Sequence, residues 1–182
     1  NARQIVESLP QDTPIIFGPD RNLGGYINSI TGRNMLLWDG ACHVHEKFSV
    51  EKIIELKNQY PEAKVLVHPE CKGAVVKLAD KVGSTAALLQ YSIKDSANVF
   101  IVATESGILH EMQKACPEKT FIPAPPSDST CACNECSYMK LVTMQKLYDC
   151  LLNESPEIHV DAEVAEKAIL PIIGACGGMI VP

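Results

Sequence analysis

Five short stretches of the chain are apolar throughout, with no alternation of polar and apolar positions. Strands that are covered on both faces show this pattern, and such strands occur mainly in parallel sheets. The predicted strands are residues 14–17, 35–38, 65–67, 99–102 and 121–122.

Most of these stretches are separated by segments in which apolar residues recur at helical spacing. Ser49 is a suitable N-cap for the first of the predicted helices. The predicted inward faces are Val50, Ile53, Ile54 and Tyr60, then Val75, Val76, Ala79 and Val82, then Ile108, Met112 and Ala115. Alternating strands and helices are typical of βαβ units, so the sequence predicts an α/β fold with parallel sheets.

The composition changes after Pro123. Further prolines and a polar stretch predict a loop over residues 123–129, because proline fits neither a helix interior nor a central strand. The loop leads to the cysteines of residues 131–136. Two helices are predicted beyond it, one over 139–152 with Ser137 as its cap, the other from Asp161 to Pro171.

Composition excludes several classes of protein. The 182 residues carry a net charge of −6 and no basic block, which argues against nucleic-acid binding. A hydrophobic fraction of 46 % is too high for a disordered tail. The longest uncharged run, 168–182, is too short to cross a bilayer, and no secretory signal is visible. We therefore expect no membrane association and a cytoplasmic location.

Eight cysteines are the unusual feature of the composition: Cys42, Cys71, Cys116, Cys131, Cys133, Cys136, Cys150 and Cys176. A chain of this length without an export signal is expected to reside in a reducing compartment, where disulfides are rare. Metal or redox chemistry is the preferred interpretation there.

Polar residues follow four of the predicted strands directly, in residues 18–22, 39–45, 68–71 and 103–105. Ligands of parallel α/β proteins bind beyond the carboxyl ends of the strands, so these segments are expected to form one site. Each polar residue has an alternative role as a cap or turn residue, and Asp20 and Glu105 fit either interpretation equally well.

Two of these segments carry candidate chemistry. Cys42 and His45 are three residues apart, close enough to share a site, although a single cysteine after a strand is more often a small buried residue than a ligand. His68 and Glu70 alternate along an extended segment and point the same way, which suits an acid/base pair.

Residues 83–85, Gly-Ser-Thr, precede a helical stretch. Free N–H groups at a helix start together with two hydroxyls suit a phosphate or carboxylate, but on the motif alone an ordinary N-cap is the favoured interpretation.

The spacing C-x-C-x-x-C over residues 131–136 is the strongest local signal. Structural zinc needs four ligands, and no second cysteine or histidine pair lies nearby. Iron–sulfur clusters accept distant cysteines, and a cluster with three protein ligands keeps an open iron that can act as a Lewis acid. Both interpretations remain open on the residues alone.

Taken together, six segments resemble the quinolinate synthase family, occur in the family's order and cover nearly the whole chain. They are Gly18–Gly24 (GPDRNLG), Trp38–His45 (WDGACHVH), His68–Glu70 (HPE), Gly83–Thr85 (GST), Ala103–Glu105 (ATE) and Cys133–Met139 (CNECSYM). The resemblance implies a repeated αβα architecture with three related domains in a pseudo-threefold arrangement. It also implies a 4Fe–4S cluster held by one cysteine from each domain.

In this sequence Cys42 and Cys136 match two of the three cluster ligands, whereas Cys133 and Cys71 match none. The family condenses iminoaspartate with dihydroxyacetone phosphate, with loss of phosphate and water, in NAD biosynthesis. By the match, the catalytic residues would be His45, His68 and Glu70, and the substrate pocket would also contain Ser84 and Thr85.

The resemblance covers roughly the last three-fifths of the family's length. It implies that residues 1–45 are the remainder of a middle domain, that 46–125 form a further α/β domain, and that 126–182 pack on a first domain. The first cluster cysteine and several substrate-binding residues are expected in that N-terminal part of the same protein, so the chain alone is expected to be inactive. Val142 stands where the family has an asparagine.

Two other classes of function remain as alternatives. One is a non-enzymatic zinc or iron–sulfur module that uses the C-terminal cysteines Cys131, Cys133 and Cys136 with Cys150 or Cys176. The other is a metal-independent enzyme acting on a sugar phosphate through His68 and Glu70.

Overall fold

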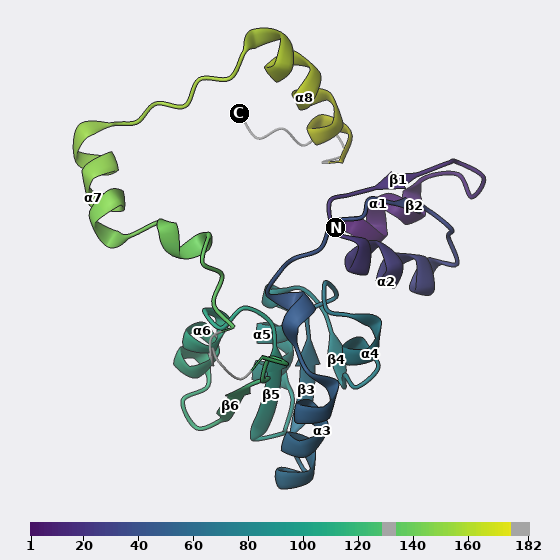
Figure 1. Cartoon of the computed structure of the whole chain (residues 1–182), viewed down its shortest axis with the longest axis vertical. Coiled ribbons are helices and arrows are strands. Elements are labelled where there is room, and N and C mark those ends of the chain that lie inside the picture. Colours follow the sequence, from purple (N-terminus) through teal and green to yellow (C-terminus); the bar gives the residue numbers. More distant parts are fainter. Residues whose placement is uncertain (129–133, 176–182) are drawn as a thin grey trace.

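The computed structural model describes residues 1–128 and 134–175, which form two units with parallel sheets and two further helices (Figure 1). The α/β fold with parallel sheets predicted from the sequence is confirmed. Within these ranges no helix has the length and apolar character needed to cross a membrane.

The first unit pairs β1 (Ile16–Phe17) with β2 (Leu36–Leu37) in parallel and packs α1 (Ala2–Ser8) and α2 (Arg21–Thr31) beside them. Val6, Ile27 and Met35 form its small core. The α2 helix ends at Gly32, whose φ of 68° lies in the left-handed region that glycine adopts without strain.

The second unit contains a four-stranded parallel sheet in the order β4-β3-β5-β6. Its strands are β3 (Lys64–Val67), β4 (Lys81–Val82), β5 (Val99–Ala103) and β6 (Thr120–Pro123). Its helices are α3 (Val50–Gln59), α4 (Gly73–Val76), α5 (Thr85–Lys94) and α6 (Ile108–Ala115), and a 3-10 helix, His45–Lys47, precedes α3.

Both faces of the two central strands are covered, which explains why β3 after Lys64 and β5 are apolar throughout. On one face Val65, Val67 and Ile101 pack with residues of α3 and α4. On the other face Leu66, Phe100 and Val102 pack with Leu88 of α5 and Met112 of α6.

The C-terminal segment consists of a 3-10 helix (Met139–Leu141), α7 (Met144–Asn153) and α8 (Ala162–Ala175). The two longer helices lie apart from the four-stranded sheet (Figure 1). Many of their apolar side chains are exposed, including Leu151 at 73 % and Leu170 at 67 %.

The first sheet is also open on one side. Ile16, Leu36 and Trp38 expose 78 %, 68 % and 66 % of their surfaces. The sequence predicted these strands to be covered on both faces, but in the described residues one face of the β1–β2 pair has no covering layer.

Several local predictions were wrong. Val82 does not continue a helical face: it pairs with Val67 in β4, a strand too short to show a pattern. Ile54 and Tyr60 are exposed at 44 % and 39 %.

The C-terminal helix boundaries also differ from the prediction. Thr143, not Ser137, caps α7, because its side chain accepts the Lys146 N–H at 3.2 Å. The α8 helix runs through Pro171 to Ala175, because a proline within a helix can kink it without ending it.

Candidate metal and substrate site

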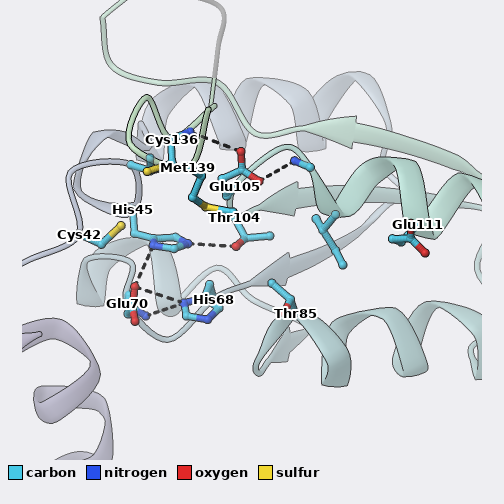
Figure 2. Close-up of a pocket in the computed structure, with 13 residues that line it drawn as sticks. Cys42, His45, His68, Glu70, Thr85, Thr104, Glu105, Glu111, Cys136 and Met139 are labelled. Carbon is cyan, nitrogen blue, oxygen red and sulfur yellow. Dashed lines mark hydrogen bonds and ion pairs between the residues drawn. The ribbon is translucent and has the colours of Figure 1, made fainter. Parts of the chain in front are cut away.

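A cavity of about 610 Å³ lies at the carboxyl ends of β3 and β5, where the sequence predicted the functional residues to meet (Figure 2). Six of the seven predicted site residues line it: Cys42, His45, His68, Glu70, Thr85 and Cys136. Ser84 does not line the cavity. It is exposed, and its hydroxyl caps α5 by accepting the Ala87 N–H at 3.3 Å.

His45 lies at the centre of the site, on the 3-10 helix that follows the β2 loop. Its Nε2 shares a hydrogen bond of 3.0 Å with Thr104 Oγ1, and both residues are buried. Its Nδ1 lies 3.1 Å from Glu70 Oε2 without the alignment of a hydrogen bond. Among the described residues, Nδ1 is thus a buried nitrogen that faces the carboxylate with no well-directed partner.

His68 stacks on His45, with ring centroids 4.5 Å apart. The Glu70 backbone N–H donates to His68 Nδ1 at 3.3 Å, which assigns this nitrogen as the acceptor and places any proton of the neutral ring on Nε2. Burial lowers the pKa of His68, and the nearby His45 lowers it further, against the opposite effect of Glu70. His68 is therefore neutral at neutral pH.

The surroundings of Glu70 favour its charged form, whereas those of His68 favour the neutral form. Its contact with His45 lowers the pKa of the carboxyl group more than partial burial raises it, so Glu70 is ionised at neutral pH. Cys42 also contacts this carboxylate. The ligand atoms of Cys42, His45 and Glu70 lie within 4.8 Å of one another, a donor set of sulfur, nitrogen and oxygen that suits a metal ion (Figure 2).

Cys136 reaches the same cavity from a distant part of the chain, after β6. Both Cys136 and Cys42 are free, partly buried thiols that pack against one core cluster. Asn134 anchors the Cys136 segment: its backbone carbonyl accepts the Ser106 N–H at 3.0 Å, and its side-chain amide donates to the Ala124 carbonyl at 2.5 Å.

Cys71 lies near these thiols but is unsuited to be a ligand. Only 1 % of its surface is exposed, and its thiol donates to the Ala103 carbonyl at 3.4 Å. Burial raises the pKa of Cys71 far above its usual range, so the thiolate that a metal needs is disfavoured.

The residues present fit an iron–sulfur cluster in part. Two accessible thiols border a cavity of sufficient size, and no third free cysteine lines it among residues 1–128 and 134–175. Cys131, Cys133 and Cys176, which the alternative zinc module would require, lie outside the described residues. Cys150 lies on α7 and is exposed.

Two residues that support the site had no role assigned from the sequence. Thr104 belongs to the Ala-Thr-Glu segment after β5, and Asn134 lies between two cysteines. A threonine directly after a buried strand was the available signal for Thr104. Nothing in the sequence indicated that His45 would be its partner.

The fold and site define a parallel α/β protein with thiol, imidazole and carboxylate groups gathered at the ends of its strands. Residues 1–174 match the family model of the quinolinate synthetase A protein, NadA, and the chain belongs to this family.

Curated relatives agree with this assignment. Over 172 residues, 94 % of this chain, it is 56 % identical to a quinolinate synthase of Microcystis aeruginosa and 53 % identical to one of a Synechococcus species. It is 52 % identical to a quinolinate synthase of Chloroherpeton thalassium over the same length. The chain spans about half the length of these relatives, 54 %, 54 % and 53 % respectively.

Proposed function

We propose that this chain is part of a quinolinate synthase, which condenses iminoaspartate with dihydroxyacetone phosphate to quinolinate, with loss of phosphate and water, in NAD biosynthesis. The names of the relatives support the activity. The structural observation that carries the proposal is that Cys42 and Cys136, far apart in the sequence, line one cavity together with His45, His68 and Glu70.

In this proposal Cys42 and Cys136 hold a 4Fe–4S cluster together with a cysteine from the rest of the protein. When bound, the cluster supplies an open iron whose Lewis acidity makes a substrate hydroxyl a better leaving group. The buried Nδ1 of His45 and the Glu70 carboxylate, both close to Cys42, supply further polar groups on that side of the cavity.

The protonation states suit acid/base chemistry. The ionised Glu70 can accept a proton from substrate carbon, and the neutral His68, whose Nδ1 accepts the Glu70 N–H, can donate a hydrogen bond from Nε2 to a substrate oxygen. The bond from Thr104 keeps the His45 ring in one orientation beside them. Because carbon–carbon bond formation and two eliminations need several proton transfers, a cluster of three such groups is appropriate.

Thr85 is proposed to bind a substrate anion. It is the first residue of α5 and lines the cavity, so its hydroxyl and the N–H groups of the first helical turn lie beside the space available for a phosphate or carboxylate. Ser84 would assist as the residue that starts this helix.

The rest of the same protein is the proposed partner. Exposed apolar side chains on β1, β2, α7 and α8 suit a covering layer, and the relatives have about as much sequence again to provide one. We propose that residues 1–45 are the remainder of a middle domain, that 46–125 form a further α/β domain, and that 126–182 pack on the first domain of a pseudo-threefold arrangement. The enzyme would be cytoplasmic and inactive without its N-terminal part.

The decisive experiment compares Cys42→Ser with Cys150→Ser in the complete protein, purified without oxygen. The proposal predicts that Cys42→Ser loses most of its iron and sulfide and its quinolinate formation, whereas Cys150→Ser retains both. A local module that uses Cys150 predicts the reverse pattern of metal content. A metal-independent enzyme predicts normal turnover after the metal has been removed with a chelator.

A further inference from the structure

Asp20 is a buried carboxylate that the proposed chemistry does not use. Only 5 % of its surface is exposed, and both of its oxygens accept backbone hydrogen bonds. Oδ1 accepts the Leu23 N–H at 2.8 Å and thereby caps α2, while Oδ2 accepts the N–H of Cys42 at 2.8 Å. One side chain therefore joins the loop after β1 to the cysteine in the loop after β2.

The two loops interlock at further points. The Arg21 N–H donates to the Gly40 carbonyl at 2.8 Å. A Cβ atom on Gly40 would lie 2.4 Å from the Pro19 carbonyl oxygen, so only glycine permits this approach. The position of the Cys42 backbone is thus determined largely by the Asp20 loop.

Cys136 has a similar arrangement on the other side of the cavity. Its backbone N–H donates to Glu105 Oε1 at 3.4 Å, and Glu105 Oε2 accepts the Gly107 N–H at 2.7 Å. Like Asp20, Glu105 follows a strand of a parallel sheet. Each thiol in the cavity therefore belongs to a residue whose N–H is bound to a carboxylate from a neighbouring strand end.

This arrangement has two physical consequences for a metal centre. Carboxylates on rigid strand ends keep the two thiols in place before a metal arrives, which lowers the entropy lost on binding. Hydrogen bonds to cluster sulfurs and local net charge both tune the reduction potential. A carboxylate that occupies the cysteine N–H removes a donor from the sulfurs and adds negative charge nearby, and both effects lower the potential.

We propose that Asp20 and Glu105 are positioning residues for Cys42 and Cys136, and that they hold the cysteines for the metal and keep its potential low. The inference rests on the proposed role of the two cysteines. Asp20 is expected to position its cysteine more firmly than Glu105 does, because its bond to the cysteine is shorter and it is buried, whereas Glu105 is only partly buried.

The test uses the complete protein with its metal, purified without oxygen. Asp20→Asn removes the charge and one of two acceptors. Asp20→Ser keeps a hydroxyl that can cap α2 but is too short to bond Cys42 as well. Asp39→Asn is the matched control, because Asp39 lies in the Cys42 loop with its side chain 93 % exposed and bonds Arg21 rather than a cysteine.

We expect both variants of Asp20 to shift the one-electron reduction potential upward and to lose iron to a chelator several-fold faster than the wild type. Glu105→Gln should shift the potential in the same direction by less, and Asp39→Asn should match the wild type. Circular dichroism and thermal melting show whether the Asp20 variants are folded. If both Asp20 variants were unfolded, the reduction potential and iron loss of Glu105→Gln would decide whether the inference holds, because Glu105 caps no long helix.

Wild-type potential and wild-type iron loss in the folded Asp20 variants would overturn the inference, as would equal shifts in Asp39→Asn. Failure of the proposed function has a different signature: a wild-type protein without a cluster, or a Cys42→Ser variant that retains one.

Discussion

Replacing Thr104 by valine tests the central contact of the site. Valine has nearly the shape of threonine but no hydroxyl, so His45 Nε2 would lose its partner at 3.0 Å while remaining buried. Leaving a buried polar group unsatisfied costs about 1–3 kcal/mol. If the whole cost appears in the transition state, kcat/KM for quinolinate formation falls about 5- to 150-fold.

The matched variant is Thr104→Ser, which keeps the hydroxyl and removes one methyl group, at a cost to stability of about 1 kcal/mol. Urea unfolding should show that both variants are less stable than the wild type. Steady-state turnover of the complete protein should separate them, with the serine variant close to wild type and the valine variant impaired. Equal turnover in the two variants would refute the reasoning that this hydroxyl orients His45.

Two further predictions concern the first unit. Gly24→Ala should destabilise the protein by about 1–3 kcal/mol, because its Cβ would lie 2.6 Å from Leu37 and 2.8 Å from Phe17. Gly25→Ala should stabilise α2 by about 0.5–1 kcal/mol, because a Cβ at this position would meet nothing within 4 Å. Urea unfolding of both variants measures the two free energies. Trp38 is the single tryptophan and is 66 % exposed, so its emission should be red-shifted and easily quenched by acrylamide in this chain alone, and blue-shifted and protected in the complete protein. Equal quenching in both proteins would contradict the proposed covering of the β1–β2 face.

The buried strands were predictable because their cause is local. A strand covered on both faces needs apolar side chains at every position, and the stretches in β3 and β5 show this directly. The N-cap roles of Ser49 and Ser84 were also predictable, since a cap needs only a hydroxyl within three residues of a free N–H. By contrast, β4 pairs only two residues, which is too short for any pattern.

The candidate site was predictable in its membership but not in its contacts. Parallel strands bring their carboxyl ends to one edge, so polar segments after the strands were expected to meet, and six of the seven candidates line one cavity. The choice between cap and site residue for Asp20 and Glu105 could not be made from the sequence. In the structure one oxygen of each accepts a nearby backbone N–H and the other accepts the N–H of a cysteine far along the chain.

The amino-acid sequence by itself therefore determined the α/β class, most strand positions and the residues able to do chemistry, because burial patterns and side-chain types are properties of short segments. Only the tertiary structure decided that His45 bonds Thr104 and lies beside Glu70, that Cys71 is buried against the Ala103 carbonyl, and that Asp20 accepts the Cys42 N–H. Those contacts depend on how whole strands and loops approach one another in space, and no short stretch of sequence contains that information.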